Sequence, residues 1–160
     1  MAQNPLLVIA KTPFSYRILL RSAPLVEAME KILRRLTRDR VGVLDLVGIS
    51  SVRVLIPGRR TGLVRATTLQ CIDVEGGILV VGSNWARPAH PAWSTNLQEV
   101  KTVRVLRRSN QYEAEVREIV GSERSEAWEA ILGAWPNYEL AQQKVPQRPF
   151  RIFCLAPHQS

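Results

Sequence analysis

The sequence has few cysteines, few aromatic residues and no long hydrophobic run, and each shortage excludes a class of protein. Two of its 160 residues are cysteines, Cys71 and Cys154. They are too few and too far apart for a disulfide framework or a cysteine metal site. Aromatic residues make up 6% of the chain. The tryptophans fall in expected loops and helices rather than along strand faces, which argues against a nucleic-acid-binding barrel.

The longest apolar runs, such as residues 6–10 and 78–81, are too short to cross a bilayer. Basic residues interrupt the apolar ones near the N-terminus, so a secretory signal is not expected. We therefore expect a cytoplasmic protein, with the inner face of the cell membrane as the alternative location. No repeat, low-complexity tract or linker divides the chain, which predicts a single domain over residues 1–160.

Basic residues are abundant: 22 Lys and Arg against 14 Asp and Glu give a net charge of +8. Residues 1–40 hold eight of the basic residues and three of the acidic ones. Apolar residues at helical spacing predict a helix over residues 24–38 with a basic opposite face. Residues 1–40 are thus expected to form an N-terminal arm and a basic amphipathic helix. This helix packs on the core or, alternatively, contacts an anionic membrane.

Strands are predicted over most of the remaining chain, because runs rich in Val, Leu and Ile alternate with hairpin signals such as Glu75-Gly76-Gly77. The expected strands are residues 41–48, 51–57, 63–74, 78–83, 101–108, 111–120 and 149–155, with a turn at Ser109-Asn110 and a helix over 122–133. In the hairpin around that turn, the arginines Arg104, Arg107 and Arg108 are expected to face Glu113 and Glu115. The pattern predicts an α+β, mainly β fold in which residues 41–157 form a small closed antiparallel barrel with peripheral helices.

A turn rich in arginine follows the second predicted strand. Gly58 and Gly62 allow a sharp bend, and Arg59, Arg60 and Arg65 can converge on one anion. The turn lacks the Gly-Lys-Ser/Thr ending of a phosphate-binding loop, and no helix follows it to complete a dinucleotide fingerprint. A solvated basic hairpin is the alternative interpretation.

A second group of polar and aromatic residues follows another strand end. Residues 82–85 (Gly-Ser-Asn-Trp) offer backbone amides, a hydroxyl and a side-chain amide that can bond the edge of a heterocycle. Trp93 and Asn96 lie three residues apart on a short predicted helix and share a face. Beside the arginines, this group suits a ligand with an anionic tail and a flat aromatic head. Core packing is the alternative role for each tryptophan.

Motifs for acid, base or nucleophilic catalysis are missing. His90 precedes a proline in a loop, and no carboxylate or cysteine stands at ligand spacing, so no metal site is expected. A nucleophile elbow is absent, although sequence order alone leaves a catalytic triad open. The chemistry is therefore expected to be carried by a cofactor.

In their order, these motifs resemble the deazaflavin-dependent nitroreductase family, whose members use coenzyme F420 on a split β-barrel. The resemblance covers about residues 45–157. It rests on Gly-Arg-Arg-Thr-Gly-x-x-Arg at 58–65, Val-Gly-Ser-Asn-Trp at 81–85, His-Pro-Ala-Trp-x-x-Asn-Leu at 90–97, Trp-Pro-Asn-Tyr at 135–138 and Pro-Phe-Arg-Ile-Phe-x-Leu at 149–155. It implies a fold like the FMN-binding split barrels. It also implies an oxidoreductase that transfers a hydride from reduced coenzyme F420 to a small hydrophobic acceptor, a quinone, enone or nitroaromatic.

The resemblance also implies a role for each site residue. Arg60 and Arg65, assisted by Arg59, would hold the phosphate and polyglutamate tail of the coenzyme. The rest of the implied cofactor site is Thr61, Gly62, Thr67, Gly82, Ser83, Asn84, Trp85, Trp93 and Asn96. The implied substrate-binding residues are Gln70, Trp135, Tyr138 and Ala141. Of these, Tyr138 is the implied catalytic residue, which orients the acceptor or supplies a proton.

The chain departs from the family pattern at several positions. Thr68 stands where proline is frequent, and Asn84 where many members have lysine. Gln70 and Ala141 stand where some nitro-reducing members have aromatic residues, so the acceptor is less well indicated than the cofactor. Alternatives are a relative that binds FMN or haem, and a non-catalytic carrier of coenzyme F420 or lipid. Both a monomer and a homodimer agree with the sequence.

Overall fold

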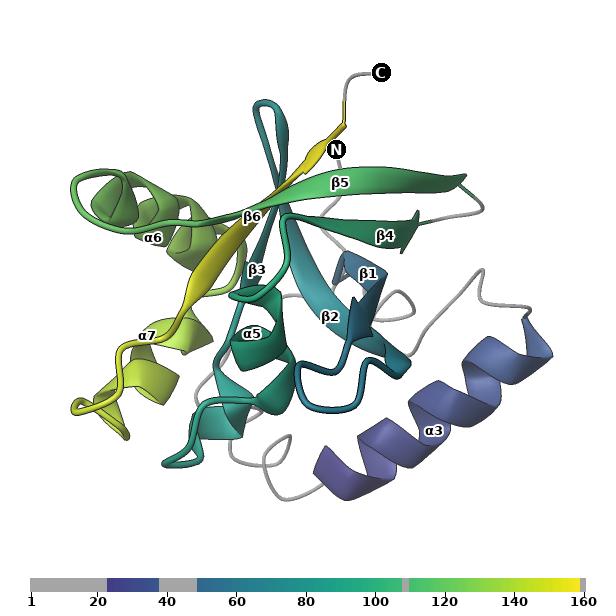
Figure 1. Cartoon of the computed structure of the whole chain (residues 1–160). Helices are drawn as coiled ribbons and strands as arrows, with labels where there is room; N and C mark the ends of the chain where they lie inside the picture. Colours follow the sequence, from purple (N-terminus) through teal and green to yellow (C-terminus); the bar gives the residue numbers. More distant parts are fainter. Residues whose placement is uncertain (1–22, 38–48, 108–109, 159–160) are drawn as a thin grey trace, which may run out of the picture.

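Six antiparallel strands close into a barrel in the computed structural model, which describes residues 23–37, 49–107 and 110–158 (Figure 1). Around the barrel the strands follow the order β1-β2-β3-β6-β5-β4. They are β1 (Ser51–Pro57), β2 (Val64–Val74), β3 (Gly77–Val81), β4 (Thr102–Arg107), β5 (Asn110–Glu118) and β6 (Ile152–Pro157). The helices are α3 (Ala23–Leu36), α5 (Ala92–Leu97), α6 (Glu123–Ala134) and α7 (Asn137–Gln143), and η1 (Asn84–Ala86) is a single 3-10 turn. The predicted antiparallel barrel with peripheral helices is confirmed.

Most predicted elements are confirmed, with small shifts at their ends. The strand expected at 41–48 and the first 22 residues lie outside the described residues. Asn110 was expected in a turn, but it already pairs with Arg107 in the β4–β5 ladder. Helix α7 was not predicted as a helix, because its seven residues are too few to show a clear helical period. None of the described helices is long and apolar enough to span a bilayer.

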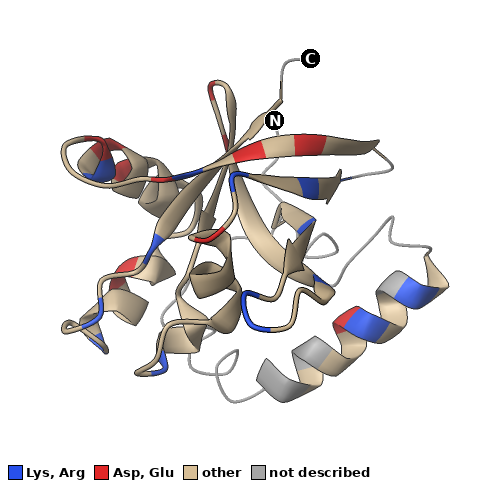
Figure 2. Cartoon of the chain, in the orientation of Figure 1, with Lys and Arg blue, Asp and Glu red and all other residues tan. Residues whose placement is uncertain are grey.

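One expected charge pair across the β4–β5 hairpin is confirmed and another is wrong. Arg104 lies opposite Glu113 in the ladder, and Figure 2 shows basic and acidic residues on these neighbouring strands. Arg107 faces the uncharged Asn110 and instead donates to both carboxylate oxygens of Asp73. This bidentate contact raises the pKa of Arg107 above its ordinary value. Arg108 lies outside the described residues.

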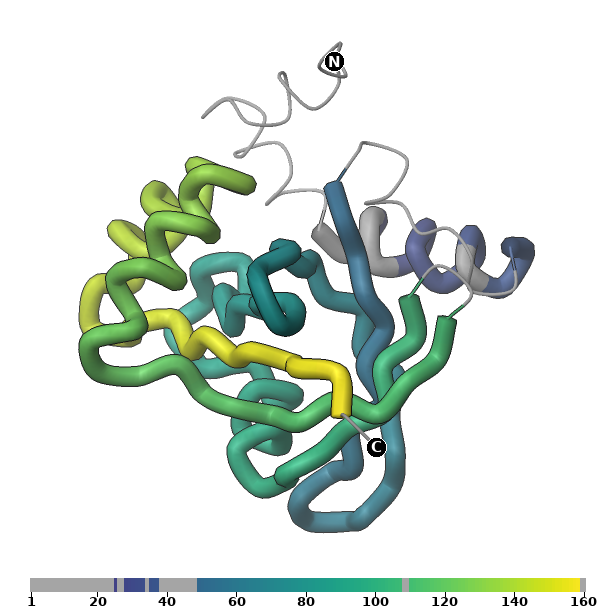
Figure 3. Tube along the Cα trace, turned by 90° about the horizontal axis from the view of Figure 1, so that it is seen from above, coloured from purple at the N-terminus to yellow at the C-terminus, as the bar shows by residue number. Residues whose placement is uncertain are grey.

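Alternate strand residues divide the core into two layers. Ile78 and Val80 of β3 are buried inside the barrel. Their neighbours Leu79 and Val81 are buried in a second cluster, which includes residues of α6 and α7 on the outside of the barrel. This is the period of two that a strand buried on both faces requires. Figures 1 and 3 show α6 and α7 on one side of the barrel and α3 on the other.

Gly77, at the start of β3, is required by a close approach between strands. A Cβ atom there would lie 2.6 Å from the carbonyl oxygen of Leu155 on β6. Since that atom belongs to the backbone, it cannot move without disturbing the β3–β6 ladder. We expect Gly77→Ala to lower the free energy of unfolding by about 1–3 kcal/mol, measured by urea denaturation.

Gly133 on α6 provides the control for this substitution. Apart from the neighbouring backbone of α6 itself, no atom lies within 4 Å of a Cβ built there, and its backbone is helical. Gly133→Ala should therefore raise the free energy of unfolding by about 0.5–1 kcal/mol. A Gly77→Ala variant as stable as the unsubstituted protein would contradict the close packing of β3 on β6.

Candidate functional site

The arginine-rich turn connects β1 to β2. Thr61 N and Gly62 N both donate to the carbonyl oxygen of Gly58, at 3.1 and 2.7 Å. Gly62 has a φ of 67°, a conformation that favours glycine. The bend exposes the side chains of three arginines, Arg59, Arg60 and Arg65. Figure 2 shows this loop as a basic segment at one end of the barrel.

Asn96, on α5, fixes the position of this turn. Its Oδ1 accepts hydrogen bonds from the backbone N of Arg59, at 3.3 Å, and from Nη1 of the same residue, at 3.2 Å. Among the described residues, no hydrogen bond or ion pair engages the guanidinium groups of Arg60 and Arg65. These two groups are therefore the ones available to an anion.

The turn η1, directly after β3, has an unusual backbone. Asn84, Trp85 and Ala86 have φ values of 49°, 54° and 56°. Three successive non-glycine residues in the left-handed region are strained, and such strain persists only where the surrounding structure imposes it. Asn84 Nδ2 donates to the carbonyl oxygen of Ala89 at 2.7 Å, which closes the loop that follows. Strained segments of this kind are concentrated at ligand sites.

A cavity of about 440 Å³ lies between β2, η1, α7 and α3. This is the volume of a typical small-molecule site. It brings together many predicted site residues: Thr67, Gln70, Ser83, Asn84, Trp85, Trp93, Trp135, Tyr138 and Ala141. The other predicted residues do not line it: Arg59, Arg60, Thr61, Gly62, Arg65, Gly82 and Asn96. Most of these belong to the arginine-rich turn or, like Asn96, contact it.

Tyr138 lies on α7, which forms one wall of the cavity. The residue is 7% exposed, and its hydroxyl donates to Gln70 Oε1 at 3.2 Å. Its ring meets Phe150 edge-on, with 6.5 Å between the ring centroids. Trp135 and Ala141 are buried beside it. In this arrangement the hydroxyl proton is directed at Gln70, and both side chains line the cavity.

The profile of a family described as F420H(2)-dependent quinone reductase matches residues 29–157. The chain belongs to this family. A solved structure described as F420-H2 dependent reductase (FDR-A) is 27% identical, covers 66% of this chain and 93% of its own, and has a TM-score of 0.60. A second structure, described only as a domain-swapped dimer, is 29% identical, covers 84% and 98% respectively, and has a TM-score of 0.63.

A more distant similarity concerns the fold alone. The haem storage protein HutZ from Vibrio cholerae is 9% identical, covers 82% of this chain and 92% of its own, and has a TM-score of 0.53. As a member of the F420H(2)-dependent quinone reductase family, the present protein is a reductase that uses coenzyme F420. The expected family, split-barrel fold and cofactor are thereby confirmed.

The residues present fit the coenzyme of the quinone reductase family. The two unengaged guanidinium groups match its anionic tail, because arginine binds phosphate and carboxylate bidentately. The cavity next to η1 offers aromatic surface and hydrogen-bonding groups for its flat ring.

Sequence reasoning missed the other residues that line the cavity: Glu30, Lys31, Ile49, Ala66, Thr68, Leu69, Val81, Arg87, Pro91 and Asn137. A signal existed for Asn137, since it lies inside the family segment at 135–138 and is 2% exposed. No local signal existed for Lys31. Its presence at the cavity depends on where α3 lies relative to the barrel, which periodicity does not reveal.

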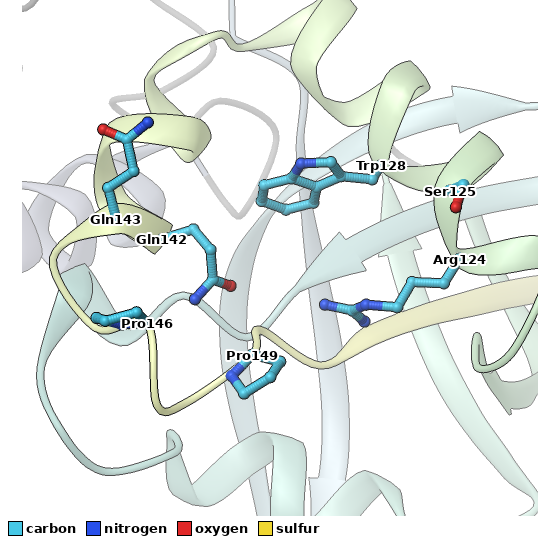
Figure 4. Close-up of a pocket in the computed structure, with 7 residues that line it drawn as sticks. All are labelled: Arg124, Ser125, Trp128, Gln142, Gln143, Pro146 and Pro149. Carbon is cyan, nitrogen blue, oxygen red and sulfur yellow. The ribbon is translucent and has the colours of Figure 1, made fainter.

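A second cavity, of about 450 Å³, lies between α6 and α7 and contains none of the predicted site residues (Figure 4). Figure 4 shows Arg124 and Trp128 on the α6 side, with Gln142 and Pro149 across from them. Three of its four polar side chains, those of Arg124, Gln142 and Gln143, bond within the protein. Arg124 Nη2 donates to the carbonyl oxygen of Phe150 at 2.8 Å, and Gln142 Nε2 donates to that of Val145 at 3.1 Å. We therefore place the candidate site of this quinone reductase family member in the first cavity.

Proposed function

We propose that this reductase transfers a hydride from reduced coenzyme F420 to a quinone. The observation that carries the proposal is the first cavity, which the polar η1 residues and the Tyr138–Gln70 pair line together. A hydride donor and an acceptor bound side by side in it would meet at the short distance that transfer requires. Enones and nitroaromatics are the other acceptors with suitable chemistry.

On the cofactor side, we assign the anionic tail to Arg60 and Arg65. Arg59 assists while it is held by Asn96, and the backbone of Thr61 and Gly62 shapes the bend. The ring of the coenzyme would lie against the following residues: Thr67, Ser83, Asn84, Trp85 and Trp93. Gly82 would contribute indirectly, as the residue that leads from β3 into this segment. When bound, the coenzyme supplies the hydride. The protein orients it and excludes water.

On the acceptor side, Trp135 and Ala141 give the cavity an apolar wall that suits a hydrophobic ring. Hydride addition to a quinone leaves negative charge on a carbonyl oxygen, which then takes up a proton. We assign to the Tyr138 hydroxyl the role of donating a hydrogen bond or this proton to the acceptor, for which its O–H would turn from Gln70 Oε1, the partner it has in the structure.

Turnover with a set of acceptors tests the proposal. Oxidation of the reduced coenzyme is followed by absorbance with quinones, enones and nitroaromatics of similar size. We expect kcat/KM for the best quinone to exceed that for the best nitroaromatic by about tenfold or more. A preference for nitroaromatics would overturn the quinone assignment. Coenzyme binding without oxidation by any acceptor would indicate a carrier, and tighter binding of FMN would contradict the cofactor placement.

Tyr138→Phe is expected to lower kcat by about 10- to 100-fold, the range for loss of a positioned proton donor. The Kd for the coenzyme should change by less than about twofold, because the phenyl ring keeps the contact with Phe150. Stopped-flow kinetics and fluorescence titration measure the two quantities. Tyr112→Phe, on β5 and half-buried against the barrel core, is the matched control and should change neither. An unchanged kcat in Tyr138→Phe would exclude the proposed role.

Two further features concern assembly and location. The relative described as a domain-swapped dimer supports a homodimer as the proposed assembly, which light scattering tests directly.

Helix α3 exposes a row of apolar side chains: Leu25, Met29, Ile32 and Leu36. We propose that this row contacts an anionic membrane. A flotation experiment tests this contact. Equal recovery of the protein in the soluble fraction with and without anionic vesicles would refute it.

A further inference from the structure

Arg148, in the connection between α7 and β6, forms hydrogen bonds to the backbone on both sides of η1. The residue is 7% exposed. Each of its three guanidinium nitrogens donates to a different backbone carbonyl. Nε bonds Arg87 at 3.0 Å, Nη1 bonds Gly82 at 3.1 Å and Nη2 bonds Ser83 at 2.8 Å. The planar guanidinium thus fixes three carbonyl groups at once.

These three carbonyls flank the strained part of the chain. Gly82 and Ser83 precede the left-handed residues 84–86, and Arg87 follows them with an extended backbone. Inside the turn, the only backbone bonds are two of the 3-10 type: Ala86 N to Ser83 O, and Arg87 N to Asn84 O, both 3.0 Å. A strained turn with so few bonds of its own needs an external restraint. The hydrogen bonds of Arg148 restrain the turn at both ends.

Arg148 is itself rigidly held. Its guanidinium carbon lies 4.9 Å from the centroid of the Phe150 ring, a cation–π contact. Gln142 of α7 donates to the carbonyl oxygens of Val145 and Arg148, both at 3.1 Å, and accepts from Phe150 N at 2.8 Å. These bonds connect η1 to α7, the helix that also carries Tyr138. One side chain therefore links the two walls of the cavity.

Stability alone is a poor explanation for this arrangement. No carboxylate pairs with Arg148 among the described residues. Burial and the nearby charge of Arg151 lower its pKa. A buried charge without a counter-ion is costly, and the three hydrogen bonds to carbonyls offset that cost only in the geometry that the turn has. What an apolar residue could not do is hold three carbonyls in a set geometry.

We propose that Arg148 is a positioning residue for the coenzyme, which acts by keeping η1 in the left-handed turn that presents Ser83, Asn84 and Trp85 to the cavity. It acts through that turn and does not line the cavity itself. The inference rests on the proposed function, because that function places the coenzyme ring beside residues 83–85.

Two variants test it. Arg148→Met removes the three hydrogen bonds but keeps an apolar chain against Phe150, and Arg148→Lys keeps the charge but not the planar fork. In Arg148→Met we expect hydrogen exchange at the amides of Ala86 and Arg87 to become about tenfold faster. The coenzyme Kd should rise by about tenfold, as for displaced binding groups. Arg148→Lys should fall between Arg148→Met and the unsubstituted protein in both measurements.

Gly77→Ala is the control, since it lowers stability at the β3–β6 contact and should change neither quantity by more than about twofold. Unchanged exchange at residues 86 and 87 in Arg148→Met would overturn the positioning role. So would an unchanged Kd in Arg148→Met while Arg60→Ala weakens binding. Either result would leave the proposed function intact. An unchanged Kd in both Arg60→Ala and Arg148→Met would instead overturn the placement of the coenzyme, and the inference with it. If Arg148→Met does not fold, Arg148→Lys decides by the same two measurements.

Discussion

Replacing Arg60 and Arg65 together by alanine is expected to weaken binding of coenzyme F420 by on the order of 4 kcal/mol, close to a thousandfold in Kd. Each substitution removes a charge-assisted contact of about 2 kcal/mol to the anionic tail. Both guanidinium groups are exposed and have no hydrogen-bond or ion-pair partner among the described residues, so little protein structure is lost with them. The effect should therefore appear in binding and not in the free energy of unfolding.

Fluorescence titration with coenzyme of short and long polyglutamate tails measures this loss. We expect the loss to be largest for the longest tail and to shrink as salt concentration rises, because the contacts are electrostatic. Arg117→Ala is the matched control. It removes one exposed positive charge, paired with Glu123, on the β5 side of the barrel. A loss as large in Arg117→Ala as in the double variant would show that net charge, rather than the arginine-rich turn, attracts the coenzyme.

The barrel was predictable because its signals are local. Strands such as β2 and β3 combine β-branched residues with a glycine turn at Gly76, whose φ of 79° matches the expected hairpin. Many expected site residues meet in one cavity for a related reason. Ser83 and Asn84 follow the end of β3, and Thr67 and Gln70 lie on the neighbouring strand β2, so the β2–β3 pairing brings both groups to one place.

What could not be predicted depends on contacts between distant residues. The ion pair of Arg107 with Asp73 joins β4 to β2, two strands that each pair with β1 and not with each other, so residue spacing does not reveal it. The three bonds of Arg148 reach residues more than sixty positions earlier in the chain. In the sequence, Arg148 stands between Gln147 and Pro149 in an expected loop, where an arginine is normally solvated. Only the tertiary structure shows that it is buried.

Phe150→Ala is expected to lower the free energy of unfolding by about 3–5 kcal/mol. The residue is fully buried beneath α6 and α7, where its ring meets Trp128 at 6.3 Å and Tyr138 at 6.5 Å between centroids. Removing the ring leaves a cavity that rigid neighbouring helices cannot close completely. Urea denaturation measures the loss. Leu155 is also fully buried, but inside the barrel. Leu155→Ala should lower the free energy of unfolding by a comparable amount, about 2–5 kcal/mol.

The two variants should differ in function, at a temperature where both are folded. Phe150 supports the ring of Tyr138 and the guanidinium of Arg148, so its loss loosens both walls of the cavity. We expect Phe150→Ala to lower kcat/KM by about tenfold or more per folded molecule, whereas Leu155→Ala stays within about twofold. Equal kcat/KM in the two variants would mean that the cluster beneath α6 and α7 stabilises the fold without positioning the site. A selective loss in Phe150→Ala would show that one buried ring maintains both the acceptor wall and the cofactor wall.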